Sequence, residues 1–371
     1  MGPFVLHPGA HLVFGADTLD GLGSLIRKLG GRRVMLVTDP GVARAGIALR
    51  AIRSMQRESI EHFVFDGVVE NPTTREVEAG VDFARQQDGI DFIAGLGGGS
   101  AMDCAKGINF LLNQGGRMED YRGAGRADLP MLPSMGIPTT AGSGSEAQSF
   151  ALIAQADTHR KMACGDEKAR FGAVILDPLL VQSAPRRVVA AAGIDAIAHA
   201  LESFVTTRRN PVSAMFSREA WRLLEPSFES VLDPSGEVEP WGRMLLGAHL
   251  AGAAIESSML GAAHACANPL TAAYGIPHGE AVGIMLPAVV RFNSAVVEEL
   301  YRDLQGSAEK LVERIVELQL AAALPRRLGD CGVGSSDLPG LAGEAASQWT
   351  GKFNPRPLDE EDWLQLFESS F

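Results

Sequence analysis

The sequence is poor in cysteine and carries an excess of negative charge. Its only cysteines are scattered and form no Cys-x-x-Cys pair, which excludes a disulfide scaffold; they are Cys104, Cys164, Cys266 and Cys331. Lysine and arginine total 33 against 45 aspartate and glutamate, a formal charge of −12 that disfavours nucleic-acid partners. The chain opens without a basic segment and apolar run, so we expect no signal peptide and a cytoplasmic location.

Long purely apolar runs are also missing. The least polar long stretch, residues 244–275, is interrupted by polar side chains at His249, Glu256, His264 and Asn268. A lipid-facing span needs about 20 predominantly apolar residues, so we expect no membrane segment. The Gly-x-Ser-x-Gly signature of serine hydrolases is absent, as is the strict Gly-x-Gly-x-x-Gly dinucleotide fingerprint.

With 371 residues the chain is long enough for roughly two domains. Its first half alternates short apolar runs with helical periodicity, which predicts a parallel, doubly wound sheet. The expected strands cover residues 33–38, 60–65, 92–96 and 173–176, and the expected helices cover 43–56, 74–87 and 101–113. The opening segment 4–14 is typical of a β-hairpin beside that sheet.

The second half is rich in alanine, leucine and glutamate, and it carries long helical patterns broken by proline and glycine. We expect helices over residues 187–207, 211–224, 242–259, 264–274, 282–292 and 296–324. The boundary lies near residue 183. The sequence therefore predicts an α/β domain over 1–183 and an all-helical domain over 184–371.

A glycine cluster joins the third expected strand to the following helix, Gly95-Leu96-Gly97-Gly98-Gly99-Ser100. Glycines let a backbone approach a bulky anion, and a helix N-terminus offers unpaired N–H groups to a phosphate. The setting favours pyrophosphate binding, although a plain tight turn is the alternative. A further segment dense in hydroxyls and glycines, residues 138–146, suits contacts with a nucleotide or an ordinary solvated loop.

Asp39 follows the first strand, at the carboxyl edge where ligands of open α/β sheets gather. A carboxylate there can accept both hydroxyls of an adenosine ribose. It would also repel a 2′-phosphate, which favours NAD over NADP. The alternative is an ordinary turn aspartate before Pro40-Gly41.

Asp195 and His199 lie four residues apart in an apolar helical segment, so they share one helix face. Because a buried carboxylate or imidazole is costly without a hydrogen-bonding or charged partner, both side chains need such partners. Two later histidines, His264 and His278, would complete a ligand set for a divalent transition metal such as Fe²⁺ or Zn²⁺. The alternative is an internal Asp–His hydrogen bond with two unrelated histidines. Cys266 near His264 is more typical of inert packing than of a nucleophile.

Motifs along nearly the whole chain resemble the iron-containing (metal-dependent, group III) alcohol dehydrogenases, which include lactaldehyde reductase and 1,3-propanediol dehydrogenase. The resemblance rests on Thr38-Asp39-Pro40-Gly41, Asn71-Pro72-Thr73, residues 97–106 and 138–146, Ile175-Leu176-Asp177-Pro178, Gly193-Ile194-Asp195-Ala196, Pro277-His278-Gly279 and Asn354-Pro355-Arg356-Pro357. It implies an N-terminal dinucleotide-binding, Rossmann-like domain, an all-helical metal- and substrate-binding domain, dehydroquinate synthase-like architecture and a homodimer.

By position, the resemblance makes Asp195, His199, His264 and His278 the metal ligands. It places NAD(P) on a larger set of residues, namely Asp39, Asn71, Gly97, Gly98, Gly99, Ser100, Thr139, Thr140, Ser143 and Lys161. One position departs from the family pattern. Many relatives carry a histidine near the substrate four residues after the third ligand, and here it is Asn268, which cannot titrate near neutral pH.

We therefore expect reversible hydride transfer between NAD(H) and a small primary alcohol or aldehyde, with Fe²⁺ or Zn²⁺ as the metal. Two alternatives share the fold: a polyol oxidoreductase like glycerol dehydrogenase, or a lyase like dehydroquinate synthase that uses NAD only transiently. A third is a non-catalytic nucleotide- or metal-binding module, which Asn268 keeps open.

Overall fold

A computed structural model describes residues 9–158, 160–233 and 236–371. The described chain divides into two compact units. The α/β unit contains 9–140 and Gly144–Ala184, and the helical unit contains Ala141–Ser143 and Pro185–Phe371. The short segment Ala141–Ser143 thus groups with the helical unit, although its neighbours on both sides belong to the α/β unit.

The α/β unit is built on a six-stranded sheet with the strand order β1-β9-β6-β4-β2-β3. Every pairing in this sheet is parallel, which confirms the predicted fold class. In that order, the strands span His11–Phe14, Ala173–Leu176, Ser134–Pro138, Phe92–Gly97, Arg33–Val37 and Glu61–Phe65. Because all strands run in the same direction, the carboxyl ends of β2, β4 and β6 lie at the same edge of the sheet.

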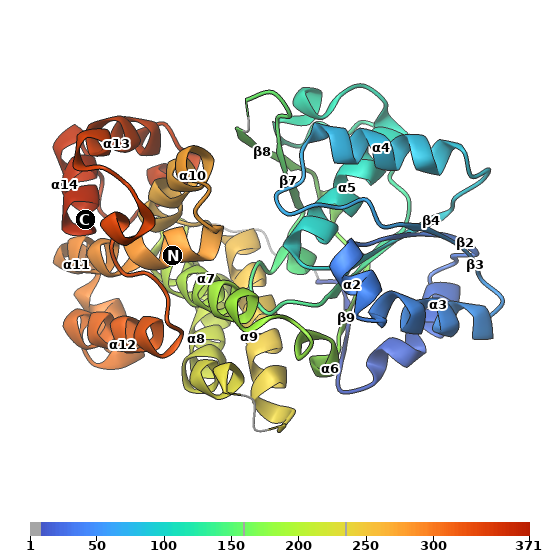
Figure 1. The fold of residues 1–371 in the computed structure, drawn as a ribbon, viewed down its shortest axis with the longest axis horizontal. Coiled ribbons are helices and arrows are strands. Elements are labelled where there is room, and N and C mark those ends of the chain that lie inside the picture. The colour runs from blue at the N-terminus through green and yellow to red at the C-terminus, as the bar shows by residue number, and fades with distance from the viewer. Residues whose placement is uncertain (1–8, 159, 234–235) are drawn as a thin grey trace. The chain divides into compact units, whose positions relative to one another are not determined.

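Helices cover both faces of this sheet (Figure 1). On one face lie α1 (Leu22–Lys28), α2 (Pro40–Arg44) and α3 (Ile47–Arg57), and on the other lie α4 (Thr74–Arg85) and α5 (Gly99–Gln114). Side chains of α1 and α3 form one buried core with alternate residues of β2, β4 and β6. The single helix predicted over 43–56 is divided, because Gly46 adopts φ 78° between α2 and α3.

Two features of the α/β unit differ from what the sequence predicts. Residues 4–8 of the predicted hairpin lie outside the described residues, and His11–Phe14 forms an edge strand parallel to β9. A second, three-stranded sheet has the order β5-β8-β7, spanning Gly123–Ala124, Lys161–Gly165 and Phe150–Ala154. None of these strands was predicted from the sequence: β5 has only two residues, and β7 and β8 form an antiparallel pair of five residues each. A short helix, α6 (Pro178–Val181), follows β9.

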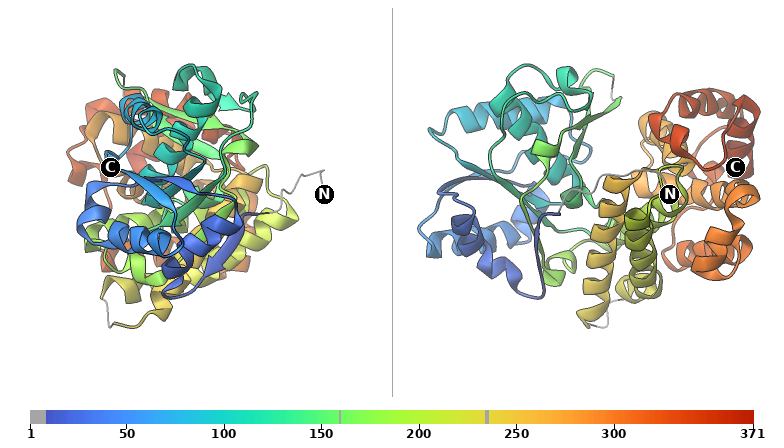
Figure 2. Two further views of the ribbon diagram at one scale, coloured as in Figure 1. Left: turned by 90° about the vertical axis from the view of Figure 1, so that its right-hand side faces the viewer. Right: turned by 180° about the vertical axis from the view of Figure 1, so that it is seen from behind.

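The helical unit begins with α7 (Arg186–Val205), α8 (Pro211–Leu232) and α9 (Glu239–Ser257), which pack side by side (Figure 2, green to yellow). A side chain on Gly193 of α7 would collide with Phe228, so the glycine permits this close packing. The remaining helices are α10 (Ala262–Tyr274), α11 (His278–Gln305), α12 (Ala308–Ala321), α13 (Leu338–Ala346) and α14 (Glu360–Ser369). The predicted helix 296–324 is divided at Gly306, and α11 is kinked at Val297.

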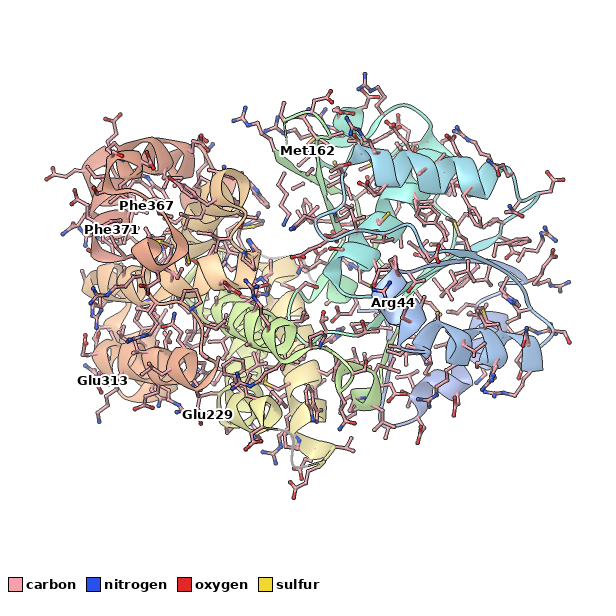
Figure 3. All side chains as sticks on the ribbon, viewed as in Figure 1. Arg44, Met162, Glu229, Glu313, Phe367 and Phe371 are labelled. Carbon is pink, nitrogen blue, oxygen red and sulfur yellow. The ribbon has the colours of Figure 1, made fainter. Side chains whose placement is uncertain are left out.

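Burial follows the amphipathic patterns of these helices. Phe367 of α14 is buried, whereas Glu229 of α8 and Glu313 of α12 are exposed (Figure 3). By length and composition alone, α7 and α11 could cross a membrane. Most of α7 is instead buried in the protein, and it carries the buried polar side chains of Asp195, His199 and Glu202.

Candidate active site

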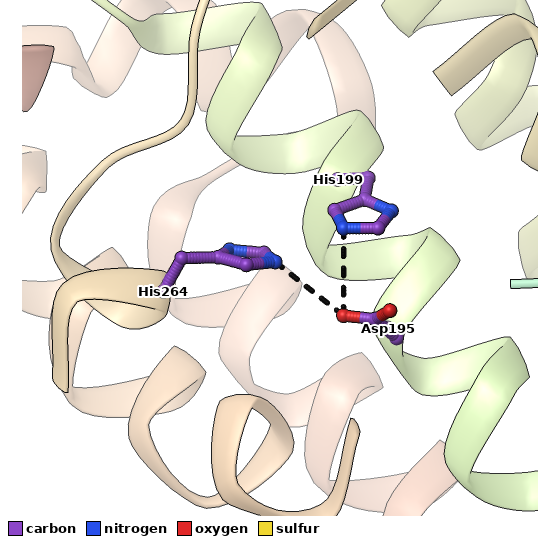
Figure 4. A group of neighbouring side chains, drawn as sticks. All are labelled: Asp195, His199 and His264. Carbon is purple, nitrogen blue, oxygen red and sulfur yellow. Dashed lines mark ion pairs between the residues drawn. The ribbon is translucent and has the colours of Figure 1, made fainter. Parts of the chain in front are cut away.

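The helical unit brings together the four side chains predicted to bind a metal. Asp195 and His199 lie one turn apart on α7, His264 lies in the first turn of α10, and His278 is the first residue of α11. The distances from Asp195 Oδ1 to the Nε2 atoms are 3.5 Å for His199, 3.4 Å for His264 and 4.0 Å for His278. Figure 4 shows the first three of these side chains pointing toward one another.

This geometry fits a cation. One ligand atom from each of Asp195, His199 and His264 lies within 4.8 Å of the others. Two atoms that each lie about 2.1 Å from a tetrahedral ion are about 3.4 Å apart, close to the distances observed. Asp195 Oδ1 and His264 Nε2 are buried and have no hydrogen-bond partner among the described residues. Buried polar atoms almost always have partners, so the site is built to hold something more.

The ionisable side chains of this site are buried, and the charge of each one affects the pKa of the others. Burial opposes ionisation of Asp195, but the neighbouring imidazoles outweigh it and hold its pKa well below the usual range. Burial lowers the pKa of His199, against the opposing effect of Asp195. Burial also opposes protonation of His264, yet Glu202 and Asp195 prevail and raise its pKa to about 9. A metal at His264 would therefore compete with a proton for Nε2.

Glu202 is a member of the site that sequence reasoning missed. Its Oε2 atom accepts a hydrogen bond from His264 Nδ1 at 2.5 Å, on the side of the ring away from Asp195. Glu202 is buried on α7, three residues after His199. The available signal was a carboxylate within an otherwise apolar helical segment, where a buried charge needs a partner.

In the α/β unit, the glycine cluster forms the turn between β4 and α5, and several predicted cofactor residues surround it. Gly97 adopts φ 155°, and Gly98 precedes α5 without any side-chain cap on the helix. The Asn71 N–H donates to Ser100 Oγ at 3.2 Å, and the Thr139 N–H donates to the Gly97 carbonyl at 2.9 Å. A Cβ at Gly98 would lie 3.4 Å from Thr140 Oγ1. The turn thus offers helix N–H groups without a side-chain cap, beside the hydroxyl groups of Ser100 and Thr140.

Asp39 performs the ordinary role that was its alternative interpretation, and it also lies beside the glycine turn. Its Oδ1 atom accepts hydrogen bonds from the N–H groups of Gly41 at 2.8 Å and Val42 at 3.0 Å, which caps α2. A Cβ at Gly97 would lie 3.1 Å from Asp39 Oδ2. One carboxylate oxygen therefore caps a helix while the other lies next to the turn.

Two further predicted cofactor residues, Lys161 and Ser143, belong to different units. Lys161 begins β8, is exposed and pairs with Ala154, whose N–H donates to the Pro72 carbonyl next to Asn71. Ser143 belongs to the segment Ala141–Ser143 of the helical unit. A Cβ at Gly142 would lie 2.6 Å from the Cβ of Ala192, so this segment lies tightly against α7.

Comparison with known proteins identifies the family. Residues 9–178 match the model named Iron-containing alcohol dehydrogenase, and residues 189–371 match the model named Fe-containing alcohol dehydrogenase family, C-terminal. The chain belongs to the iron-containing alcohol dehydrogenase family. The resemblance inferred from the sequence is thereby confirmed, and the family's cofactors are NAD(H) and Fe²⁺.

Individual relatives are similar to this chain along nearly its whole length. Alcohol dehydrogenase 4 of Schizosaccharomyces pombe (strain 972 / ATCC 24843) is 32% identical, covering 96% of this chain and 87% of its own. The 1,3-propanediol dehydrogenase of Klebsiella pneumoniae is 30% identical and covers 96% of both chains. The crystal structure of a 1,3-propanediol oxidoreductase superposes with a TM-score of 0.95 at 30% identity and covers 100% of both chains.

Two residues near the candidate metal ligands bear on the chemistry. Asn268 lies one turn after His264 on α10, and its Nδ2 donates to Gln348 Oε1 at 3.1 Å. Sequence reasoning missed Gln348, because it lies between α13 and the short helix η7 (Trp349–Phe353), far from α10 in the chain. Burial raises the pKa of the Cys266 thiol well above its ordinary value, which is consistent with inert packing.

Proposed function

We propose that this alcohol dehydrogenase interconverts a small primary alcohol and its aldehyde with NAD(H) and a divalent metal. The observation that carries the proposal is the convergence of one buried carboxylate and three imidazoles, with two of their ligand atoms lacking any hydrogen-bond partner among the described residues. Relatives whose names specify propanediol, lactaldehyde and methanol support a small substrate.

Asp195, His199, His264 and His278 would hold the metal, and both imidazole and carboxylate suit iron and zinc. Asp39, Asn71, the turn Gly97–Ser100, Thr139, Thr140, Ser143 and Lys161 would bind NAD. When bound, the metal supplies Lewis-acid polarisation of a substrate oxygen, and the nicotinamide supplies the hydride chemistry.

The chain's own side chains prepare the site for this reaction. Asp195 contributes a single negative charge, so a divalent cation bound there keeps a net positive charge toward a substrate oxygen. The imidazole of His264 is held between Asp195 and Glu202. Asn268 offers hydrogen bonds but no proton that titrates near neutral pH, so it orients a substrate without relaying its proton.

The decisive experiment combines metal analysis with an aldehyde screen. Protein purified without chelator is analysed for iron and zinc and then assayed with NADH and a panel of small aldehydes, following the nicotinamide absorbance. We expect stoichiometric metal, NADH oxidation with at least one aldehyde, and steady NADH formation with the matching alcohol. A metal-loaded protein that leaves NADH unchanged across the panel contradicts the proposal, and the absence of NADH accumulation with any alcohol favours a lyase.

Replacing Asp39 tests the preference for NAD. Asp39→Gly and Asp39→Asn both remove the charge that would repel a 2′-phosphate, and each preserves most of the capping of α2, because glycine and asparagine are good N-cap residues. We expect the ratio of kcat/KM for NADH over NADPH to fall by about tenfold or more, since apposed like charges cost several kcal/mol. An unchanged ratio in both variants would remove Asp39 from the cofactor site.

For the whole molecule we propose a cytoplasmic homodimer without nucleic-acid or membrane partners. Support for the dimer comes from β1, which lies at the edge of the sheet and exposes Leu12 at 40% and Phe14 at 46%. An edge strand presents unpaired N–H and C=O groups that a second chain can pair with. Sedimentation of the purified protein measures this state directly, and a monomer at micromolar concentration would contradict it.

A further inference from the structure

The first turn of α10, which carries His264, is capped by side chains from elsewhere in the helical unit. The residue before the helix, Gly261, has no side chain with which to cap it. Instead, the Ala262 N–H donates to Asn354 Oδ1 at 3.3 Å, and the Ala263 N–H donates to Glu202 Oε1 at 2.7 Å. A Cβ at Gly261 would lie 3.0 Å from both acceptors, so a glycine gives them room to approach.

The two carboxylate oxygens of Glu202 have separate tasks. Oε1 accepts from the Ala263 backbone, and Oε2 accepts from His264 Nδ1 at 2.5 Å. Glu202 is 4% exposed, and no lysine or arginine of the described chain forms an ion pair with it. The negative charge of Glu202 is therefore stabilised by the positive end of the α10 helix dipole and by the hydrogen bond from the His264 ring.

The other acceptor at the start of α10, Asn354, is itself held by a reciprocal pair of hydrogen bonds with Asn293. Asn354 Nδ2 donates to Asn293 Oδ1 at 2.6 Å, and Asn293 Nδ2 donates to Asn354 Oδ1 at 3.0 Å. Both side chains are buried. The start of α10 is thus fixed by two acceptors, and only one of them, Glu202, also contacts an imidazole.

We propose that Glu202 is a positioning residue for metal binding, which orients the His264 ring and keeps its Nε2 atom available to a divalent cation. The inference rests on the proposed metal site. A hydrogen bond from Nδ1–H to a carboxylate leaves Nε2 as the free lone pair, and it fixes the plane of the ring. Nε2 then faces Asp195 Oδ1 at 3.4 Å, where the cation would lie.

The isosteric change Glu202→Gln separates this role from simple packing. Glutamine has one acceptor oxygen, but Ala263 N–H and His264 Nδ1–H need two. Its NH₂ group must therefore face one of the two donors, or donate to Nδ1 and move the ring proton to Nε2. We expect the dissociation constant for Zn²⁺, measured by competition with a chromophoric chelator, to rise about 10- to 100-fold, as for other outer ligand partners.

Two controls match this variant. Glu225→Gln makes the same change in the same unit at a residue that pairs with Arg314, and it should leave zinc affinity within about twofold. Asn354→Ala removes the other cap of α10 without touching the Glu202–His264 contact, so it should lower thermal stability while changing zinc affinity much less than Glu202→Gln does. Circular dichroism confirms folding in each case.

A second measurement does not depend on any variant folding. In the zinc-loaded wild-type protein, NMR should detect a slowly exchanging, strongly downfield proton on His264 Nδ1. Its absence, or zinc affinity in Glu202→Gln equal to the wild type, would overturn the proposal. Wild-type protein that binds no Zn²⁺ would instead refute the metal site itself, so the two failures are distinguishable.

Discussion

Replacing His264 with alanine is expected to yield a folded protein that retains no metal and turns over no NADH. The change removes one of four ligands and leaves Asp195 and Glu202 buried without the imidazole that now lies between them. Polarisation by a metal stabilises a transition state by several kcal/mol, and each 1.36 kcal/mol is tenfold in rate, so we expect kcat/KM to fall by at least roughly a thousandfold.

The measurements that check this result are metal content per chain and NADH oxidation with the best aldehyde of the panel. His62→Ala is the matched control, because His62 lies on β3 in the α/β unit and is not among the predicted ligands. Binding of NADH, followed by fluorescence, should persist in His264→Ala, since the proposed pyrophosphate turn lies in the α/β unit. An active, metal-free His264→Ala enzyme would refute the mechanism.

The sequence pointed to the four residues of the candidate metal site with unequal strength, and the reasons are physical. The spacing of Asp195 and His199 within one helical pattern was enough to place both on one face. His264 and His278 lie in the first turns of two further helices, and only tertiary packing brings them to α7. Spacing alone left them open as unrelated histidines, so their joint assignment needed the family resemblance.

The sequence pattern marked Glu202 as a buried carboxylate that needs a partner, but it could not identify that partner. Glu202 shares the helix of Asp195 and His199, but its role depends on the start of α10 and on Asn354 near the C-terminus. Asp39 gives a different lesson, because its role as a turn residue is confirmed while its role toward a cofactor stays a prediction. One oxygen caps α2, as the turn pattern predicted, and the other lies next to the glycine turn.

The fold was predictable where periodic patterns are long. Strands β2, β3, β4 and β9 and helices α4, α5 and α7 lie within a few residues of their expected bounds. Two of the missed helix boundaries depend on single glycines in the left-handed region, Gly46 at φ 78° and Gly306 at φ 84°. Another was missed because α8, predicted to end at residue 224, continues through Pro226 to Leu232. In the three-stranded sheet, β5 has only two residues, and β7 and β8 were missed although they form a local antiparallel pair.

Gly279 allows a close backbone contact that positions His278, one of the candidate metal ligands. It follows His278 at the start of α11, and a Cβ placed there would lie 1.9 Å from the Ala191 carbonyl oxygen of α7. Ala191 lies one turn before Asp195 on the same helix. The two helices that supply Asp195 and His278 can therefore approach this closely only because residue 279 has no side chain.

Gly279→Ala is accordingly expected to separate the start of α11 from α7 and to displace His278 from Asp195. Such overpacking costs typically about 1–3 kcal/mol of stability, and a displacement of about 1 Å at a reacting site can cost roughly a hundredfold in rate. We expect thermal unfolding at a lower temperature, weaker zinc binding and a kcat reduced by about that factor. The readouts are calorimetry, chelator competition and steady-state kinetics.

The matched control is Gly343→Ala in the middle of α13, where a Cβ would meet no atom within 4 Å. Alanine is favoured over glycine in a helix by about 1 kcal/mol, so this variant should be slightly more stable than the wild type and fully active. Opposite outcomes for two glycine-to-alanine changes in helices would attribute the loss to the contact with Ala191. A Gly279→Ala enzyme with wild-type zinc affinity and kcat would mean that His278 keeps its place without the close approach of α11 to α7.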